Sequence, residues 1–242
     1  MTFGTLYLLP VGLTTPGDSA NDWPHWLPAA TRDTACQLTH FVVENAKTAR
    51  LSLKSLGHPV VLRDLNITEL PKTSDTQSIE ALLAPLLAGQ DLGLMSEAGC
   101  PAVADPGALL VRAAHAHGIT VKPLVGPSAL LLSLMASGLD GQRFAFHGYV
   151  PAREPERSAA IQMLEKESAR LKQTQLFIET PYRNAALFQS LLQTCRPNTR
   201  LCIASDLSLP SESIATRTIV DWRKWETPTL DKRPTVFLLL AA

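Results

Sequence analysis

The sequence predicts an α/β protein made of two α/β domains. The first domain is an open, mostly parallel sheet, the second is a mixed sheet, and a ligand cleft lies between them. Short apolar runs alternate with helix-compatible segments up to about residue 140, which is typical of parallel βαβ units. Beyond that point the last strand-like segments follow one another without helices, which favours antiparallel pairing. We therefore expect domains at residues 1–140 and 141–242.

The strands expected in the first domain are short apolar runs, as in strands buried on both faces. They are predicted at residues 5–9, 41–44, 59–62, 91–95 and 119–124. The helices between them end at glycines. They are predicted at residues 45–56, 78–87 and 109–117, with a fourth, apolar helix that opens at Gly126-Pro-Ser128 and ends near residue 139.

The second domain is expected to begin after a Gly-Leu-Asp-Gly turn at residues 138–141. A polar segment and a long charged helix follow its first strand. Strands are predicted at residues 144–149, 175–178, near 201–204, 213–220 and 235–240, and helices at 156–172 and 184–192.

Composition narrows the function classes. The 242 residues hold 22 basic and 22 acidic side chains, so no bulk field attracts nucleic acid or an anionic membrane. The four cysteines are scattered, which indicates reduced thiols rather than disulfides or a zinc site. The apolar stretch 124–139 is shorter than the roughly 20 residues of a membrane span. With no signal-peptide pattern, we expect a cytoplasmic protein without membrane segments.

Several nucleotide and hydrolase motifs are missing. The sequence has no P-loop, no Gly-x-Gly-x-x-Gly after the first strand and no Gly-x-Ser-x-Gly. His115 and His117 point to different faces of one helix, so they are interpreted as exposed helix-end residues. No metal site is expected. His147 is assigned a core or hinge role, with a ligand role as the alternative.

Three loops rich in glycine and proline follow strands of the first sheet. They are residues 10–15, 96–105 and 126–129. Ligands of open α/β sheets bind at the carboxyl ends of the strands, so the three loops predict a shared small-molecule pocket. The N-terminus opened by Gly126-Pro-Ser-Ala129 suits a carboxylate or a ribose hydroxyl, and plain N-capping by Ser128 is the alternative.

Two further segments carry candidate substrate groups. Glu179, Tyr182 and Arg183 follow the strand at 175–178 and suit a flat or anionic substrate, although an ordinary helix start explains them nearly as well. Trp222-Arg-Lys-Trp225, together with Arg153 and Arg157, offers basic and aromatic surface. A packed tail is the favoured interpretation of the two tryptophans, and stacking on bases is the alternative.

At these loops the sequence resembles the tetrapyrrole methylase superfamily, and within it the branch that holds the bacterial 16S rRNA ribose 2′-O-methyltransferase. The resemblance covers nearly the whole chain, and its motifs occur in the same order. They are Leu6-Tyr-Leu-Leu-Pro-Val-Gly12, Ser96-Glu-Ala-Gly-Cys-Pro-Ala-Val-Ala-Asp-Pro-Gly107, Pro123-Leu-Val-Gly-Pro-Ser-Ala129 and Phe144-Ala-Phe-His-Gly-Tyr-Val-Pro151.

The resemblance implies a two-domain methyltransferase, usually a homodimer, that binds S-adenosylmethionine between its domains. Carried over position by position, it implies cofactor contacts from all three loops and from two later strand ends. These are Pro10, Gly12, Leu13, Ser96, Glu97, Ala98, Gly99, Cys100, Val103, Ser128, Ala129, Ala204 and Thr235. Cys100 stands where many relatives carry Asp.

The methyl acceptor stays open at this point. The rRNA branch carries Gly-Asn-Leu and then Asp after its first loop, where this chain has Leu13-Thr-Thr-Pro-Gly-Asp18, and its Glu-Asp-Thr-Arg pattern is Glu44-Asn-Ala-Lys47 here. RNA ribose in the small ribosomal subunit is the first hypothesis. A tetrapyrrole or another small molecule is the alternative acceptor, and a non-catalytic S-adenosylmethionine-binding protein is the third interpretation.

A ribose hydroxyl acceptor calls for a general base within hydrogen-bond reach. The candidates are the carboxylates at loop ends, Glu44, Glu97 and Glu179, and the sequence does not rank them. Substrate contacts are predicted from Arg153, Tyr182 and Arg183.

Overall fold

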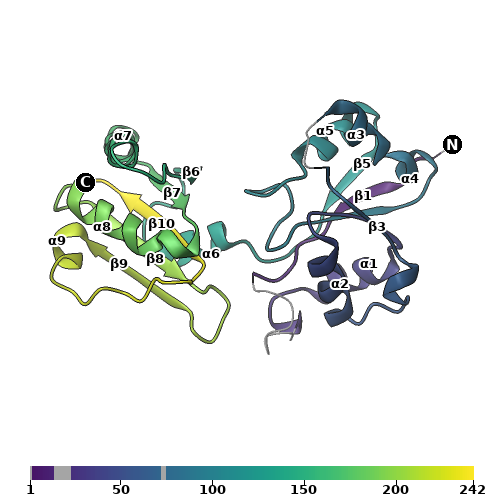
Figure 1. Cartoon of the computed structure of the whole chain (residues 1–242), viewed down its shortest axis with the longest axis horizontal. Helices are drawn as coiled ribbons and strands as arrows, with labels where there is room; N and C mark the ends of the chain where they lie inside the picture. Colours follow the sequence, from purple (N-terminus) through teal and green to yellow (C-terminus); the bar gives the residue numbers. More distant parts are fainter. Residues whose placement is uncertain (1, 14–22, 72–74) are drawn as a thin grey trace. The chain divides into compact units, whose positions relative to one another are not determined.

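A computed structural model describes residues 2–13, 23–71 and 75–242 of the chain. Contacts divide the chain into two compact units, Met1–Ser128 and Ala129–Ala242 (Figure 1). Each unit is built on a five-stranded sheet with helices on its faces. The α/β class predicted from the sequence is confirmed, with one parallel and one mixed sheet.

The sheet of the first unit has the strand order β3-β2-β4-β1-β5, and every neighbouring pair is parallel. Its strands are β1 (Thr5–Leu8), β2 (His40–Val43), β3 (Asn66–Glu69), β4 (Leu92–Met95) and β5 (Thr120–Pro123). The central strand β4 is buried along its whole length, which explains its continuous apolar run.

Helices cover both faces of this sheet. They are α1 (Ala29–Gln37), α2 (Ala46–Ser55), α3 (Thr76–Ala81), α4 (Ala84–Leu87) and α5 (Ala108–Ala116), with 3₁₀ turns at Trp23–His25 and Leu62–Asp64. One core cluster joins Ala35 of α1 and Leu53 of α2 to Phe41 of β2. A separate cluster joins α3, α4 and α5 to the other face, with Leu110 among its buried residues (Figure 1).

The second unit has the strand order β6-β7-β10-β8-β9, in which only β6 and β7 pair in parallel. Its strands are β6 (Phe144–Tyr149), β7 (Thr174–Ile178), β8 (Arg200–Ser205), β9 (Ser213–Thr218) and β10 (Thr235–Leu240). Its helices are α6 (Ala129–Ser137), α7 (Glu156–Leu171), α8 (Asn184–Thr194) and α9 (Ile219–Trp222), with a 3₁₀ turn at Pro181–Arg183.

Two cores hold the second unit together. The larger one packs α7, α8 and α9 on one face of the sheet, and it contains the stacked rings of Phe177 and Phe237, whose centroids are 6.0 Å apart. The smaller one packs α6 on the other face, where Leu134 lies with Leu176 and Cys202. The sequence assigned α6 to the first domain; the structure groups it with the second unit because its apolar side chains pack on β8 and β10.

Among the predicted elements, one strand and one helix differ from the structure. The segment predicted as a strand at 59–62 is a turn. The His58 ring holds it, because its Nε2 donates to the Leu38 carbonyl at 3.0 Å and its Nδ1 accepts the Val60 N–H at 3.2 Å. The third strand is instead β3, further along the chain. The helix predicted at 78–87 is divided into α3 and α4, because Pro85 has no N–H to donate and lies in the first turn of α4. Helix α1 was not predicted.

His115 and His117 are exposed near the end of α5, as predicted, and His117 lies 2.7 Å from the Glu80 carboxylate. His147 on β6 contacts the Gln175 side chain within the second sheet. In the described ranges, no helix has the length and apolarity of a membrane span. The same residues hold no group of three or more His, Cys, Asp or Glu side chains suited to a metal ion.

Candidate functional site

The carboxyl ends of β1, β2, β4 and β5 lie along one edge of the first sheet, because all of its strands are parallel. The three glycine- and proline-bearing loops begin there. The loop after β1 is described to Leu13, and the substitutions noted at residues 14–18 lie outside the described residues. Contacts between the described residues of the three loops test the prediction that the loops lie together.

Backbone hydrogen bonds join the loop after β1 to the loop after β4. Val11 donates its N–H to the Gly99 carbonyl at 2.9 Å, and Gly99 donates back to Val11 at 3.2 Å. Gly99 has φ +69°, a conformation that favours glycine, and a Cβ there would lie 3.3 Å from Leu13 Cδ2. The two loops thus form one continuous rim.

The loop after β5 packs against this rim. A Cβ on Gly126 would lie 2.3 Å from Pro10 Cβ, so the two loops approach as closely as a glycine allows. Cys100 Sγ lies 3.4 Å from the Pro127 carbonyl, to which it donates a weak hydrogen bond. Thr31 of α1 also holds the loop after β5, because its hydroxyl donates to the Val125 carbonyl at 2.8 Å.

Burial and the neighbouring Asp105 raise the pKa of the Cys100 thiol. At neutral pH this position therefore has no negative charge.

Carboxylates from two strand ends meet beside the rim. Glu44, which follows β2, accepts the backbone N–H of Glu97 at 3.0 Å, and Glu97 accepts from the Thr48 hydroxyl at 3.2 Å. Asp105 lies in the loop after β4, close enough to Glu44 and Glu97 for their charges to act on it. The structure thus brings two of the three predicted base candidates together and adds a third carboxylate.

Asp105 was not singled out from the sequence. Burial, together with the charge of Glu44, raises its pKa to about 6. A carboxyl group that titrates this close to neutral pH is characteristic of functional sites. The available signal in the sequence was its position, since it is the only Asp in the segment 96–107 and precedes Pro106-Gly107.

We expect Asp105→Asn to stabilise the protein at neutral pH but not in acid. The pKa of about 6 lies above the value of about 3.9 in an unfolded chain, so folding favours the protonated carboxyl. The stabilisation by the protonated Asp105 carboxyl is complete in acid and is lost as the pH rises through 6. Asparagine cannot ionise, so the variant gains about 1 kcal/mol at neutral pH once solvent screening of a partly exposed group is allowed for.

Urea unfolding at about pH 4 and about pH 7.5 measures this difference. The matched control is Asp231→Asn, at an exposed aspartate of the second unit. Equal effects of Asp105→Asn at the two pH values would show that ionisation of Asp105 does not oppose folding.

In the second unit, three of the predicted residues lie at one end of the sheet. Ala204 precedes Ser205, whose hydroxyl lies 2.9 Å from the Thr235 hydroxyl on the neighbouring strand. Glu179 follows β7, one residue beyond the pairing of Ile178 with Val236. Ala204, Thr235 and Glu179 thus lie at the same end of three neighbouring strands, while Ala129 begins α6.

Glu179 is held by Arg183. Their side chains are 2.7 Å apart, and the Thr180 N–H also donates to the carboxylate. Burial opposes ionisation of Glu179, but the hydrogen bonds from Arg183 and Thr180 outweigh it and lower its pKa. A carboxylate held in this way is a poor proton acceptor, so the structure disfavours Glu179 as the general base.

The predicted substrate residues are only partly brought together. Tyr182 is 76% exposed beside Arg183 in the same 3₁₀ turn. Arg153 is exposed between β6 and α7, where its carbonyl accepts from Arg157. As far as the structure describes the chain, Arg153 makes no hydrogen bond or ion pair with Tyr182 or Arg183.

The two tryptophans of the 222–225 segment have different environments. Trp222 is buried against Phe188 and donates its ring N–H to the Leu201 carbonyl, as expected of a packed tail. Trp225 is 58% exposed.

Comparison with known proteins places the chain among methyltransferases. A family model described as Tetrapyrrole (Corrin/Porphyrin) Methylases matches residues 32–221. The solved structure of the methyltransferase CobJ is similar in fold, with a TM-score of 0.60 over 100% of this chain and 95% of that chain at 18% identity.

Curated relatives carry the name ribosomal RNA small subunit methyltransferase I. The protein from Xylella fastidiosa is 34% identical over 190 residues, covering 78% of this chain and 63% of the relative. The protein from Pseudomonas aeruginosa is 34% identical, covering 59% and 49%. The protein from Escherichia coli O157:H7 is 29% identical, covering 98% and 77%. The matches thus span about half to three quarters of these relatives' length.

Proposed function

This chain belongs to the tetrapyrrole (corrin/porphyrin) methylase family, and we propose that it transfers a methyl group from S-adenosylmethionine to a ribose 2′-hydroxyl of small-subunit ribosomal RNA. The joined loops at the carboxyl edge of the first sheet carry the cofactor part of this proposal. The names of the curated relatives support the RNA part.

The residues of the rim fit the cofactor. Gly99 pairs its backbone with Val11, and Gly126 lets the Pro10 ring pack directly on its backbone, so glycine at these two positions allows the three loops to form one compact rim. Glu97 and Asp105 are carboxylates, which accept hydrogen bonds from hydroxyl or ammonium groups and attract a positive charge. The bound cofactor supplies a methyl group on a positively charged sulfonium. We assign cofactor contacts to Pro10, Gly12, Leu13, Ser96, Glu97, Ala98, Gly99, Cys100, Val103 and Ser128, and, from the resemblance, to Ala129, Ala204 and Thr235 in the second unit.

The chain's own contribution to methyl transfer is alignment and proton acceptance. An in-line displacement requires the acceptor oxygen to face the methyl group with water excluded. A ribose hydroxyl also needs a base for its proton. Among the carboxylates of the first unit, Asp105 has a pKa of about 6, which suits this role near neutral pH. Glu44 accepts the backbone N–H of Glu97, Glu97 accepts from the Thr48 hydroxyl, and both remain candidates.

The proposal is tested by incubating the protein with methyl-labelled S-adenosylmethionine and small ribosomal subunits from cells that lack this activity. We expect label in acid-precipitable, nuclease-sensitive material. Alkali cleaves RNA through the 2′-hydroxyl, so a methylated ribose is recovered as an alkali-resistant dinucleotide. Label in ordinary mononucleotides would indicate methylation of a base instead.

The other interpretations give different results in the same assay. Label in acid-soluble products, after addition of porphyrin or corrin precursors, would indicate a small-molecule acceptor. Cofactor binding by calorimetry without transfer to any of these substrates would indicate a non-catalytic binding protein. The partner assignment, including the homodimer, stays a prediction that sedimentation of the purified protein tests.

A further inference from the structure

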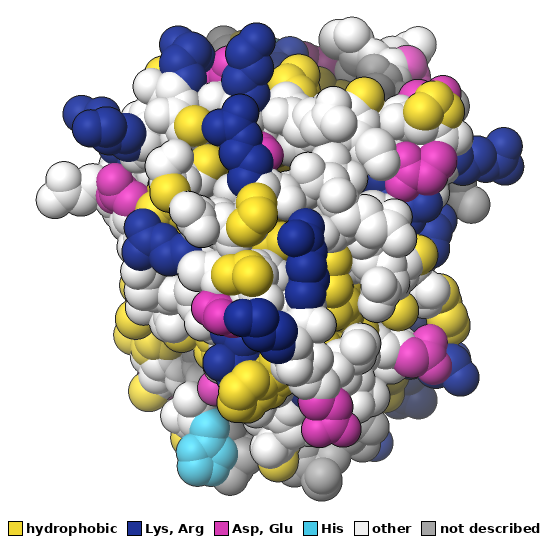
Figure 2. All heavy atoms as spheres, turned by 90° about the vertical axis from the view of Figure 1, so that its left-hand side faces the viewer, with side chains coloured by type: hydrophobic (Ala, Val, Ile, Leu, Met, Phe, Trp, Pro, Cys, Tyr) yellow, Lys and Arg dark blue, Asp and Glu magenta, His cyan; other side chains and the backbone are white. Residues whose placement is uncertain are grey.

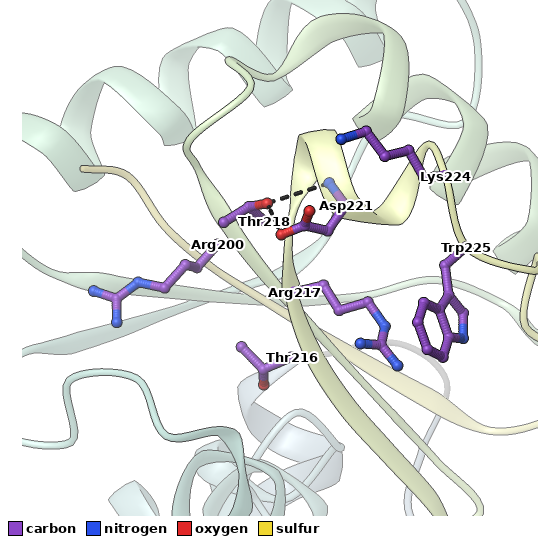
Figure 3. Close-up of a pocket in the computed structure, with 7 residues that line it drawn as sticks. All are labelled: Arg200, Thr216, Arg217, Thr218, Asp221, Lys224 and Trp225. Atoms are coloured by element: carbon purple, nitrogen blue, oxygen red, sulfur yellow. Dashed lines mark hydrogen bonds between the residues drawn. The ribbon is translucent and has the colours of Figure 1, made fainter.

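The surface of the second unit is hollowed around the start of β8 and the junction of β9 with α9. The hollow has a volume of about 660 Å³, and we call it the β9 hollow. Figure 3 shows its side chains. They are Arg200, Thr216, Arg217, Thr218, Asp221, Lys224 and Trp225. Lys224 and Trp225 belong to the 222–225 segment, for which stacking on bases was the alternative interpretation, and the other five residues belong to neither the cofactor nor the substrate assignments above.

An arginine is packed against two tryptophans on one wall of the β9 hollow. The guanidinium carbon of Arg217 lies 3.7 Å from the centroid of a Trp225 ring and 5.4 Å from that of Trp222. Figure 3 shows Arg217 and Trp225 side by side. The Nε atom of Arg217 is buried and has no hydrogen-bond partner among the described residues. This Nε–H therefore has hydrogen-bonding capacity that no described residue satisfies.

The charge of the β9 hollow is positive although the whole chain is neutral. Asp221 is the acidic residue among the seven, and its carboxylate is occupied by the Thr218 hydroxyl at 2.5 Å. In the described part of the chain, Arg200 and Lys224 form no ion pair, and both are exposed. Figure 2 shows Lys and Arg side chains running down this end of the second unit, with hydrophobic side chains between them.

Trp225 also borders a second hollow, of about 410 Å³. Gln189, Gln193 and Thr227 contribute hydrogen-bonding groups to it. Arg223 lies there too, but it donates to the Leu192 and Cys195 carbonyls at the end of α8 and so has a structural role. An exposed aromatic ring is therefore flanked by cations on one side and by neutral hydrogen-bonding groups on the other.

We propose that the β9 hollow and the adjoining face of Trp225 bind single-stranded RNA, with phosphates held by Arg200, Arg217 and Lys224 and a base stacked on Trp225. This inference rests on the proposed RNA acceptor and adds a contact outside the methyl-transfer site. Cations beside an exposed aromatic ring are the combination that sequence-tolerant single-strand binding uses. An acidic protein segment would match the charges but would make no use of the stacking face or the amide groups.

The test measures binding of a short, fluorescein-labelled single-stranded RNA of mixed sequence by anisotropy, at several salt concentrations and without cofactor. We expect Arg200→Ala/Lys224→Ala to weaken binding about tenfold and to reduce the slope of log Kd against log salt by about 1.4, since each lost phosphate contact removes about 0.7. We expect Trp225→Ala to weaken binding at least about fivefold with little change in slope, and Trp225→Phe to retain most of it.

The matched control is Lys54→Ala/Lys166→Ala, which removes two exposed lysines elsewhere and so lowers the net charge equally. Circular dichroism checks that each variant is folded. An equal loss of affinity in the control and the Arg200/Lys224 variant would overturn the proposal, because binding would then follow net charge. A Trp225→Ala variant that binds as the wild type does would overturn the stacking.

Failure of this inference differs from failure of the proposed function. If the wild type methylates RNA but the substitutions in the β9 hollow leave RNA affinity unchanged, the methyltransferase proposal stands and the proposed RNA surface is wrong. If the substitutions weaken RNA binding but no methyl is transferred to RNA, the surface stands and the proposed acceptor is wrong. A wild type that binds no RNA, but crosslinks through this face to a ribosomal protein, would overturn the RNA surface.

Discussion

Replacement of Gly126 by alanine is expected to reduce S-adenosylmethionine binding at least about tenfold, or to abolish it, while the first unit stays folded. The new Cβ would lie 2.3 Å from Pro10 Cβ and 2.8 Å from Pro10 Cγ. The proline ring cannot rotate away, so one of the two loops must move. Overpacking of this kind costs about 1 to 3 kcal/mol, which is less than the stability of most domains.

Calorimetric titration with S-adenosylmethionine measures the loss, and circular dichroism with thermal unfolding measures the retained fold. Gly141→Ala is the matched control, since a Cβ at Gly141 meets nothing within 4 Å. We expect this control to bind as the wild type does. If Gly126→Ala, with its loops displaced, also binds with wild-type affinity, then the rim at the carboxyl ends of β1, β4 and β5 is not the cofactor site.

The parts of the fold that could be predicted are those with local signatures. Strand β4 is apolar throughout because both of its faces are buried, and the glycines and prolines after it mark a loop. Strand β3 has no such signature. It lies at the edge of the sheet, and three of its four residues are exposed. Its place is set by pairing with β2, which is a contact between distant parts of the chain.

Prediction of the candidate site was limited for the same reason, because some of its properties depend on contacts between distant parts of the chain. The loop motifs identified the rim, but the raised pKa of Asp105 depends on Glu44, which arrives from a different strand end. The sequence could not separate Trp222 from Trp225 either. Only the packing of α9 on the sheet makes the first a core residue and leaves the second exposed beside Arg217.

We expect Arg183→Ala to destabilise the second unit strongly, lowering Tm by at least about 5 °C, although Arg183 itself is half exposed. The Glu179 side chain is 0% exposed whereas that of Arg183 is 45% exposed, and they form an ion pair of 2.7 Å. Glu179 Oε2 is already buried without a hydrogen-bond partner among the described residues. Loss of the guanidinium therefore leaves a buried carboxylate with little compensation, which is the costly way to break such a pair.

The pH dependence separates this cause from simple loss of packing. In the wild type the pKa of Glu179 is lowered, since the hydrogen bonds from Arg183 and Thr180 outweigh its burial, so its contribution to stability is present at neutral pH and is lost in acid. Without Arg183 the burial dominates and raises the pKa, so the deficit in Tm grows with pH and shrinks in acid.

The double variant Glu179→Gln/Arg183→Ala removes the buried charge and is expected to recover most of the lost Tm at neutral pH. If it is no more stable than Arg183→Ala, and the deficit does not change with pH, then Arg183 supports the second unit by packing alone. Because Arg183 is also a predicted substrate contact, a double variant that regains its stability but fails to methylate RNA, when Glu179→Gln alone still methylates it, would assign Arg183 both roles. The stability of the second unit and the recognition of RNA would then depend on the same guanidinium, because Arg183 would both keep Glu179 ionised and contact the RNA.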